Sequence, residues 1–431
     1  MFILDKRICL LQIYKLFLLQ NRIDMLSKNE LLDVVHQQKT KLNNDNSYPR
    51  KLLKNLTNID KEFVHIISGI RRCGKSTLMA QLIHSQTEST FYLNFDTPRL
   101  FGFDFTDFRI IDDILREQTD IKWLFFDEMQ IVDSWEIYVR GKLDEGYGVV
   151  ITGSNASLPS RELGTKLTGR HITKELFPFS FQEFCEYKHL ERGEESLINY
   201  LKTGGFPQYI KTKNKEILNQ LVMDIIYRDI AVRYNIRDEQ SLKRLFIFLV
   251  SNIGNLVTAT RLKQVMNIKS TATLLDYFSF YEETYLLHLL PKYSYSVKAQ
   301  MINPKKIYLI DTGLQYVLSS SFSENTGKRL ENMVYLELRR HSKELFYFSE
   351  NSKECDFVIF ENGKVKTVIQ VCSQLNNENS KRETEGLLEA MNYFQIIQGF
   401  LLTLNQSDTI YNGNKRITVV PVYDFDFEKM F

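Results

Sequence analysis

The chain has 431 residues, of which 43% are hydrophobic and 25% are charged. This composition is typical of a folded globular protein, and the length predicts roughly two to four domains. The net charge of +2 results from nearly equal numbers of acidic and basic residues, so overall charge gives no argument for a nucleic-acid partner. The five cysteines include no C-x-x-C pair, which argues against a disulfide framework and a zinc site and favours a reducing, cytoplasmic location.

An apolar run near the N-terminus is interrupted by Gln12 and Lys15. The run is therefore too short for a transmembrane span of ~20 apolar residues, and no small-residue cleavage site of a signal peptide follows it. We expect either a short amphipathic helix or an extension upstream of a start at Met25. Residues 1–60 are accordingly predicted to form an N-terminal extension with helices, and no membrane partner is expected.

Residues 63–82 combine a buried strand, a glycine-bounded loop and a helix. The loop from Gly69 to Ser76 has the G-x-x-x-x-G-K-S pattern of a phosphate-binding loop. Gly69 and Gly74 permit the backbone angles with which successive N–H groups point at phosphate oxygens. Lys75 supplies positive charge to the β- and γ-phosphates, and the Ser76 hydroxyl is suited to ligate Mg²⁺. The sequence therefore predicts a site for ATP and Mg²⁺.

Four further residues of this stretch are predicted to line the nucleotide: Arg71, Arg72, Cys73 and Thr77. The two arginines are expected either to add charge to the phosphates or to pair with Asp229 further along the chain. We expect the Cys73 thiol to lie beside the bound anion, so that its oxidation or alkylation blocks ATP binding.

Strand and helix alternate after the loop, as in a doubly wound parallel sheet. The apolar strand 123–126 stops at Asp127 and Glu128. Asp127 is predicted to hold the Mg²⁺ shell, and Glu128 to orient and deprotonate the attacking water. Two solvated carboxylates that merely end a strand are the alternative.

The next strand, 147–152, is followed by Ser154 and Asn155. Strand ends of such a sheet gather where the ligand binds, so these side chains are candidates for a sensor of the γ-phosphate; capping of a turn is the alternative. Arg170 is a candidate arginine finger, acting in cis or in trans. A surface arginine paired with a carboxylate is the other interpretation of Arg170.

The chain resembles bacterial and archaeal ATP-binding proteins of the AAA+ superfamily that carry a C-terminal region of undefined function, in the segments GIRRCGKSTL, LFFDEMQ, ITGSN, LFPFSFQEF, LKTGGFPQYI, IYRDIAVRYNIRD, YLIDTGL, RLENMVYLELRR and CDFVIF. These segments cover the chain from about Met25 to its end. The resemblance implies an ASCE-type ATPase core over residues 61–180, with Asp127 and Glu128 as its second motif, a sensor in the ITGSN strand and a finger at Arg170.

Residues 181–250 carry apolar residues at helical spacing, interrupted by a Gly-Gly pair and a proline, and predict a helical lid. A lid beside a nucleotide site can report on the γ-phosphate. The candidates for this coupling are Arg228, Asp229, Arg233 and Arg237. A solvated, charged helix face is the alternative.

The sequence pattern of residues 251–300 predicts a helix, a tight turn and a second helix, which resembles a winged helix-turn-helix module. The second helix, 271–283, has no Lys or Arg and carries Asp276, Glu282 and Glu283. Because acidic groups repel phosphates, domain docking or protein contact is favoured over DNA reading by this helix.

Residues 301–431 alternate strand and helix in an order that resembles the restriction-endonuclease-like fold. Active members require a helix Glu, a strand-end Asp and an E/D-x-K element that together hold a metal and stabilise charge. Glu331 and Asp356 match, but Gln370 and Cys372 stand in place of the Glu and the Lys, so we predict a catalytically degenerate domain. As a binding platform, this domain is expected to offer a basic patch made of Lys328, Arg329, Arg339 and Arg340. A solvated helix face is the alternative.

The predicted fold is thus α/β: a P-loop NTPase of ASCE/AAA+-like type with a parallel sheet, a helical lid, a winged helix-turn-helix module and a C-terminal restriction-endonuclease-like domain. The predicted function is hydrolysis of ATP with Mg²⁺ to move the C-terminal modules, which bind a DNA or protein partner; a homo-oligomer is a further expectation. Two alternatives stay open: a nucleotide-gated scaffold with negligible turnover, and an ATP-coupled DNA nuclease.

Overall fold

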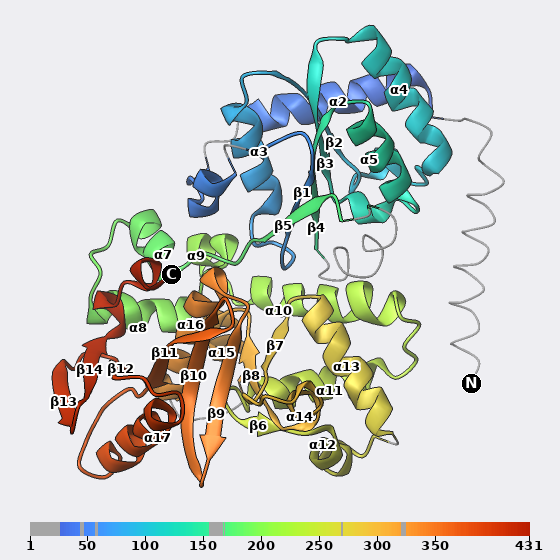
Figure 1. The fold of residues 1–431 in the computed structure, drawn as a ribbon. Coiled ribbons are helices and arrows are strands. Elements are labelled where there is room, and N and C mark those ends of the chain that lie inside the picture. The colour runs from blue at the N-terminus through green and yellow to red at the C-terminus, as the bar shows by residue number, and fades with distance from the viewer. Residues whose placement is uncertain are drawn as a thin grey trace.

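The computed structural model describes residues 26–43, 47–56, 59–154, 167, 169–268, 270–319 and 325–431. In these ranges the chain forms a five-stranded, a three-stranded and a six-stranded sheet. The five-stranded sheet with its helices lies at the top of Figure 1, and the two other sheets lie below it.

The first sheet has the order β2-β3-β4-β1-β5, and all neighbouring strands run parallel. This is the doubly wound arrangement that the alternation of strands and helices predicts. Its elements are α2 (Lys28–Asn43), the 3₁₀ helix η1 (Lys51–Asn55), β1 (Val64–Ser68), α3 (Lys75–Ser85), β2 (Ser89–Asn94), α4 (Phe108–Glu117), β3 (Ile121–Asp127), the 3₁₀ helix η4 (Met129–Ile131), α5 (Trp135–Asp144), β4 (Gly148–Gly153) and β5 (His171–Glu175).

The strands of this sheet are apolar on both faces. Ile67 and Phe125 belong to the core that includes α3, whereas their neighbours Ile66 and Leu124 belong to the core that includes α4 and α5. Successive side chains of a strand point to opposite faces, so a sheet with helices on both faces needs near-continuous hydrophobic runs. The runs VHIIS and WLFF largely meet this requirement, with His65 as a buried polar residue within β1.

A helical region follows β5. It comprises α7 (Phe181–Lys188), α8 (Glu194–Thr203), α9 (Pro207–Thr212), α10 (Glu216–Asp224), a π-helical segment (Ile225–Val232) and α11 (Glu239–Val250). The turn between α8 and α9 requires glycine, because Gly204 has a φ of +70° and a Cβ on Gly205 would lie 2.2 Å from the Phe179 carbonyl oxygen. A π-helical turn is rare and is found most often at functional sites.

The next module contains β6 (Leu256–Val257), α12 (Ala259–Met266), α13 (Thr271–Glu283), β7 (Leu287–Leu290), α14 (Val297–Ile302) and β8 (Lys305–Leu309). The strands form an antiparallel sheet in the order β6-β8-β7. One face of α13 is buried through Leu274, Tyr277, Phe278 and Tyr281, and the Tyr281 hydroxyl donates a hydrogen bond to the Leu242 carbonyl in α11. This face therefore packs inside the protein, while the assignment as a winged helix stays a prediction.

The C-terminal region has a mixed sheet in the order β13-β14-β12-β11-β10-β9. The helix α17 packs on one face of this sheet, with Leu387 and Met391 against Val368 and Leu401. The elements are α15 (Thr312–Leu318), α16 (Thr326–His341), β9 (Leu345–Glu350), β10 (Lys353–Glu361), β11 (Lys364–Val371), α17 (Ser380–Tyr393), β12 (Gln398–Thr403), β13 (Asp408–Asn412), β14 (Lys415–Pro421) and α18 (Phe427–Met430). The restriction-endonuclease-like assignment also stays a prediction.

One hydrophobic cluster connects the upper and lower parts of the molecule. It includes Leu78 of α3, Phe246 of α11, Leu338 of α16 and Ile369 of β11. The phosphate-loop helix and the C-terminal sheet therefore share one hydrophobic core. Across the described ranges, no helix has both the length and the apolar composition that a membrane crossing requires.

Candidate nucleotide-binding site

The phosphate loop connects β1 to α3 at the carboxyl edge of the first sheet. Gly69 has a φ of +148°, and a Cβ there would lie 2.2 Å from the Leu176 carbonyl oxygen. Gly74, directly before α3, has a φ of +103°. Both glycines are therefore needed by the backbone, and the loop presents its N–H groups next to the positive end of the α3 dipole.

A buried arginine supports this loop from behind. Arg50 is 3% exposed and donates hydrogen bonds to the Cys73 carbonyl (2.8 Å), the Phe177 carbonyl (2.8 Å) and the Glu183 carboxylate (3.0 Å). Burial alone would raise the pKa of Glu183, but the charge and the hydrogen bond of Arg50 outweigh it and lower that pKa. Arg50 was not predicted, because nothing in its local sequence distinguishes it from a surface arginine.

Lys75 is 4% exposed and folds back over the loop. Its Nζ donates to the Gly69 carbonyl (3.1 Å) and the Ile70 carbonyl (3.3 Å) and lies 3.7 Å from a carboxylate oxygen of Glu128. The lysine of the first motif and the glutamate of the second therefore meet at one position, as the sequence predicts for a shared phosphate site.

Asp127 is fully buried at the end of β3. Its Oδ2 accepts hydrogen bonds from Asn94 (2.9 Å) and Tyr92 (3.2 Å) of β2, and its Oδ1 accepts one from the Thr152 hydroxyl of β4. The Ser76 hydroxyl forms a further hydrogen bond with this carboxylate. Three of these partners, Tyr92, Asn94 and Thr152, were not predicted; they become neighbours only through the strand order β2-β3-β4.

Burial raises the pKa of Asp127, and the nearby negative charge of Glu128 raises it further. Such a carboxylate is stabilised in its ionised form by an added cation. The exposed Ser76 hydroxyl and the Asp127 carboxylate are hard oxygen donors of the kind Mg²⁺ prefers, so the residues fit this ion.

Glu128 follows Asp127 in a left-handed backbone conformation with a φ of +54°. Its N–H donates to the Thr152 hydroxyl at 2.9 Å, which fixes the turn after β3. The Gln130 amide donates to the Glu128 carboxylate and lies 3.4 Å from the Ser154 hydroxyl. Gln130 thus connects Ser154 to Glu128, whereas Asn155 lies outside the described residues and its sensor role stays a prediction.

Both arginines of the loop contact the helical region. Arg71 binds the Asp229 carboxylate through Nε (3.2 Å) and Nη2 (3.3 Å), and Arg72 binds Asp224 at 3.0 Å. The pairing of Arg71 with Asp229 is therefore confirmed, while direct contact of either arginine with phosphates stays a prediction. Burial raises the pKa of Asp229, Arg71 opposes this shift, and the charge of Glu128 adds to it.

The Cys73 thiol is fully buried in the hydrophobic core that includes Ile67 and Leu176. Its predicted position beside a bound anion stays a prediction. Burial also raises its pKa, so the reactive thiolate is disfavoured. Thr77 lies half-buried in the first turn of α3, where its contact with nucleotide stays a prediction.

The structure does not bring Arg170 to the site. Arg170 precedes β5, and its carbonyl accepts a hydrogen bond from the N–H of Val64 at the beginning of β1. It therefore lies at the opposite edge of the sheet from the phosphate loop, about 15 Å away for a five-residue strand. Its guanidinium binds Asp144 at 2.6 Å on the surface. An intramolecular finger is thus wrong, and a finger that acts on a second copy stays a prediction.

The expected basic patch on α16 is also wrong. Arg339 binds Glu175 at 2.8 Å, Arg340 donates to the Pro178 carbonyl at 2.7 Å, and Arg329 is only 6% exposed. Arg339 and Arg340 thus fasten α16 to the β5–α7 connection, whereas Arg329 lies over the Tyr316 ring of α15.

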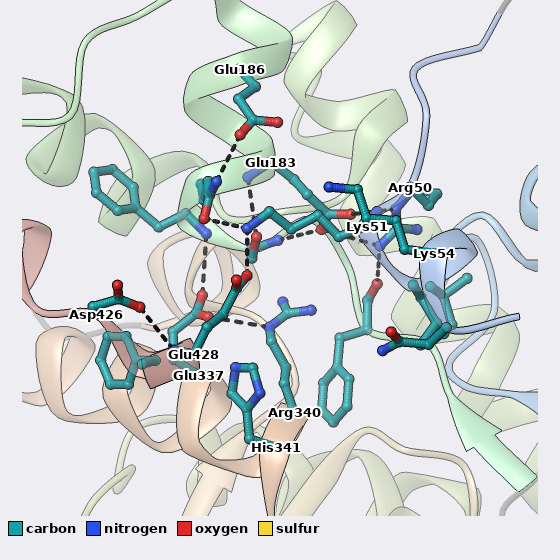
Figure 2. Close-up of a pocket in the computed structure, with 18 of the residues that line it drawn as sticks. Arg50, Lys51, Lys54, Glu183, Glu186, Glu337, Arg340, His341, Asp426 and Glu428 are labelled. Carbon is teal, nitrogen blue, oxygen red and sulfur yellow. Dashed lines mark hydrogen bonds and ion pairs between the residues drawn. The ribbon is translucent and has the colours of Figure 1, made fainter. Parts of the chain in front are cut away.

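A cavity of about 940 Å³ lies where η1, α7, α16 and the C-terminal segment meet (Figure 2). Lys51, the neighbour of Arg50, binds Glu428 of α18 at 2.8 Å, and Glu337 of α16 accepts a hydrogen bond from the Phe181 N–H at 3.2 Å. The support of the phosphate loop is therefore directly connected to the last helix of the chain.

The sheet order, the phosphate loop and the acidic pair define a nucleotide-binding AAA domain, and the family model described as "AAA domain" matches residues 61–185. Two models of domains of unknown function, DUF8612 and DUF4143, match residues 194–325 and 326–425. The chain belongs to the same family as the uncharacterized protein MJ1544 of Methanocaldococcus jannaschii, with 34% identity over 380 residues, 83% of this chain and 84% of that protein.

An uncharacterized protein of Haemophilus influenzae is 30% identical over 360 residues, which are 78% of this chain and 89% of that protein. Among solved structures, a Walker-type ATPase of Pyrococcus abyssi superposes with a TM-score of 0.42 and 13% identity, over 64% of this chain and 97% of the other. AMPPCP-bound DnaA from Aquifex aeolicus superposes with a TM-score of 0.28 and 12% identity, over 54% and 85% of the two chains.

Proposed function

We propose that the protein binds and hydrolyses ATP with Mg²⁺, and that the nucleotide state changes the position of its C-terminal modules. The observation that carries this proposal is the convergence of Lys75, Ser76, Asp127 and Glu128 at one edge of the parallel sheet. Lys75 and Glu128 are 3.7 Å apart although 53 positions separate them in the sequence.

Each group has a defined task in this proposal. The loop N–H groups and Lys75 bind the phosphates. The Lys75 ammonium then gives up its hydrogen bonds to the Gly69 and Ile70 carbonyls and contacts phosphate oxygens instead. Ser76 and Asp127 would hold Mg²⁺, which when bound neutralises charge on the phosphate oxygens. Glu128, held by Gln130, orients the attacking water and accepts its proton.

The coupling to the C-terminal modules is proposed to begin at Arg71 and Arg72. Both ion pairs connect the phosphate loop to the end of α10 and to the π-helical segment. Phosphates placed in the loop compete with Asp229 and Asp224 for these guanidinium groups. The helical region then moves relative to the loop, and the shared hydrophobic core passes this displacement to the C-terminal sheet.

The test is the variant Glu128→Gln, measured for ATP binding and for phosphate release. We expect ATP binding to persist and phosphate release to fall by about 10²- to 10⁴-fold, because the amide cannot accept the proton. Glu117→Gln is the matched control, since the Glu117 side chain is 68% exposed on α4. Unchanged phosphate release in Glu128→Gln removes Glu128 from the mechanism; wild-type protein that binds ATP without releasing phosphate supports the scaffold alternative.

A protein partner is favoured over DNA in this proposal, because α13 buries its aromatic face and carries acidic residues. Capture with the ATP-loaded Glu128→Gln variant, followed by analysis of both nucleic acid and protein, distinguishes the two partner classes. Copies of this chain in the captured fraction would support the expected homo-oligomer.

A further inference from the structure

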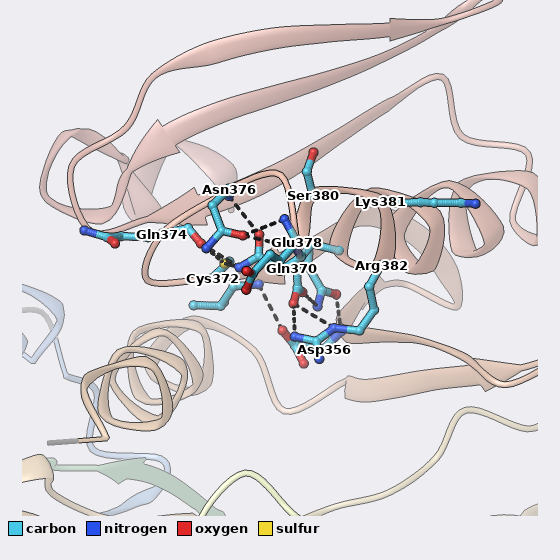
Figure 3. A network of polar contacts seen from close by, with 12 residues as sticks. Asp356, Gln370, Cys372, Gln374, Asn376, Glu378, Ser380, Lys381 and Arg382 are labelled. Carbon is cyan, nitrogen blue, oxygen red and sulfur yellow. Dashed lines mark hydrogen bonds and ion pairs between the residues drawn. The ribbon is translucent and has the colours of Figure 1, made fainter. Parts of the chain in front are cut away.

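A second polar cavity, of about 750 Å³, lies in the C-terminal domain between the first turns of α16 and α17 and the strands β10 and β11 (Figure 3). It contains the residues that the restriction-endonuclease-like resemblance singles out: Glu331, Asp356, Gln370 and Cys372. The four residues that the resemblance grouped thus line one cavity, while the assignment of the fold stays a prediction. Active enzymes of that fold hold a divalent metal ion at this position, so the donors present here can be examined for their fit to one.

The centre of this cluster is occupied by a lysine from the neighbouring module. Lys306 of β8 is 1% exposed, and its Nζ lies 2.7 Å from Asp356 Oδ1, 2.7 Å from Glu354 Oε1 and 3.3 Å from Glu331 Oε1. The Tyr308 hydroxyl, also from β8, donates to Glu331 Oε1 at 2.8 Å. An ammonium group thus lies among three carboxylates, at the place where a metal ion would bind.

The remaining oxygens of the two buried carboxylates are also engaged. Asp356 Oδ2 accepts a hydrogen bond from the Val371 N–H at 2.9 Å, and Glu331 Oε2 accepts one from Lys328 Nζ at 3.0 Å. Every carboxylate oxygen of Glu331 and Asp356 therefore has a donor within the protein. Three carboxylates face two ammonium groups here, which leaves at most one net negative charge.

The residues at the E/D-x-K position, Gln370 and Cys372, also make hydrogen bonds within the protein. Gln370 accepts a hydrogen bond from the Asp356 N–H at 3.1 Å and donates one to Glu383 at 2.7 Å. The Cys372 thiol lies 2.9 Å from the Gln374 carbonyl. The positive charge that a lysine at position 372 would bring is supplied from β8 instead.

This donor set does not fit a divalent metal ion. Mg²⁺ and similar ions need carboxylate oxygens with available lone pairs and a net negative cage. Here each oxygen of Glu331 and Asp356 already accepts an N–H or O–H donor, and the fixed ammonium of Lys306 repels any further cation. In agreement with this, no group of three or more His, Cys, Asp or Glu side chains in the described ranges is arranged to hold a metal.

We infer that Lys306 is a permanent internal counter-ion that takes the place of the metal ion, so that the C-terminal cavity binds no divalent cation. Lys306 is held in register opposite Leu290 of β7 and is 1% exposed, so its ammonium is fixed among the three carboxylates. The same cluster joins β8 to β10 and α16. This inference is independent of the proposed ATPase activity, because it concerns a different cavity.

The test is a titration of nucleotide-free, full-length protein with Mn²⁺, followed by electron paramagnetic resonance of the free ion. All proteins carry Asp127→Asn, so that the phosphate-loop site contributes no metal. We expect no Mn²⁺ bound in the cavity when Lys306 is present. Lys306→Met should create one Mn²⁺ site per chain, with an affinity at least about tenfold higher than that of the protein that keeps Lys306. The reason is that the carboxylates lose the ammonium donor and gain net negative charge.

Two further variants separate this inference from simpler explanations. Lys328→Met removes a cation from the 32%-exposed edge of the same cluster but leaves Lys306, and it should create no site. Adding Asp356→Asn to Lys306→Met should remove the new site. A folded Lys306→Met protein that binds no Mn²⁺ contradicts the inference.

Measurements on the protein that keeps Lys306 still test the inference if Lys306→Met does not fold. Mn²⁺ binding in the cavity that Asp356→Asn abolishes would overturn the inference. So would Mn²⁺-dependent cleavage of plasmid or single-stranded DNA that the same substitution abolishes. The absence of both supports Lys306 as the counter-ion.

Discussion

The guanidinium of Arg71 lies 3.2 and 3.3 Å from the two carboxylate oxygens of Asp229, which joins the phosphate loop to the π-helical segment 158 positions further along the chain. Both side chains are 22% exposed, so the pair is partly shielded from solvent. The charge of Glu128 also raises the pKa of Asp229, so these two carboxylates lie within electrostatic reach of each other. A bound triphosphate would therefore meet Asp229 as a competitor for Arg71.

The first prediction concerns this competition. Asp229→Asn should tighten ATP binding about threefold, since Arg71 is released to the phosphates and a partly exposed ion pair contributes only ~0.5–1 kcal/mol. Hydrogen exchange of residues 225–232 should respond to a non-hydrolysable ATP analogue in the wild type and lose this response in the variant. Asp113→Asn, at the exposed pair with Arg116, is the control and should change neither measurement. An equal exchange response in Asp229→Asn and wild type would show that the Arg71–Asp229 pair does not couple bound ATP to residues 225–232.

The second prediction concerns Arg50. Arg50→Met leaves the buried Glu183 carboxylate without its partner, so we expect a loss of about 3–5 kcal/mol in the free energy of unfolding. ATP binding should weaken as well, because the Cys73 carbonyl loses the donor that holds the loop. Chemical denaturation and ATP titration measure these two effects. Arg50→Met with Glu183→Gln should recover part of the stability but not the ATP affinity; recovery of both would show that Arg50 has no role in loop geometry.

The sequence identified those parts of the site that depend on local spacing. The phosphate loop and the acidic pair each lie within one strand–turn unit, where glycine, lysine, serine and carboxylates have a chemical reason to occur at fixed positions. Arg50, Asn94 and Thr152 have no such local signature. They contact Cys73 and Asp127 only because of the strand order and the packing of η1, which depend on the whole chain.

The error for Arg170 has a topological cause. In a parallel sheet, residues that follow strands lie at one edge and residues that precede strands lie at the other. Arg170 precedes β5, so its position opposite the phosphate loop follows from the sheet direction and not from its chemistry. Lys306 could not be predicted for a related reason. The C-terminal cavity lacks the lysine of the E/D-x-K element, and the ammonium comes from β8 of the preceding module instead. No pattern within residues 328–372 indicates this.

The third prediction concerns Cys73. Since the thiol is fully buried and its pKa is raised by burial, thiol reagents should leave Cys73 unmodified in the folded protein. Mass spectrometry after native alkylation measures this, with the urea-unfolded protein as the positive control. Cys73→Ala should retain ATP binding within about twofold, because the side chain is buried in the hydrophobic core. A marked loss of ATP binding in a folded Cys73→Ala protein would indicate that the thiol contributes to the nucleotide site.

The fourth prediction concerns pH and the buried His288 of β7. Burial lowers its pKa to about 3, and the charge of Arg339 adds to this shift; the ring lies 6.4 Å from Phe177 and 5.7 Å from Tyr335. Below pH ~6.5 the unfolded chain takes up a proton at this residue while the folded chain does not, so stability falls as the pH is lowered from 6.5 towards 3. The expected slope from this one group is about 1 kcal/mol per pH unit.

His288→Phe removes the titrating group and keeps an aromatic ring between its two neighbours. We therefore expect denaturation curves measured between pH 7 and pH 5 to lose about 1 kcal/mol per pH unit less stability in His288→Phe than in wild type. His84→Phe is the control, because His84 lies at the surface end of α3 and shows no comparable burial. If His288→Phe keeps the wild-type slope, the unfolding free energy depends on other groups in this range, and the neutral, buried state of His288 contributes nothing to it.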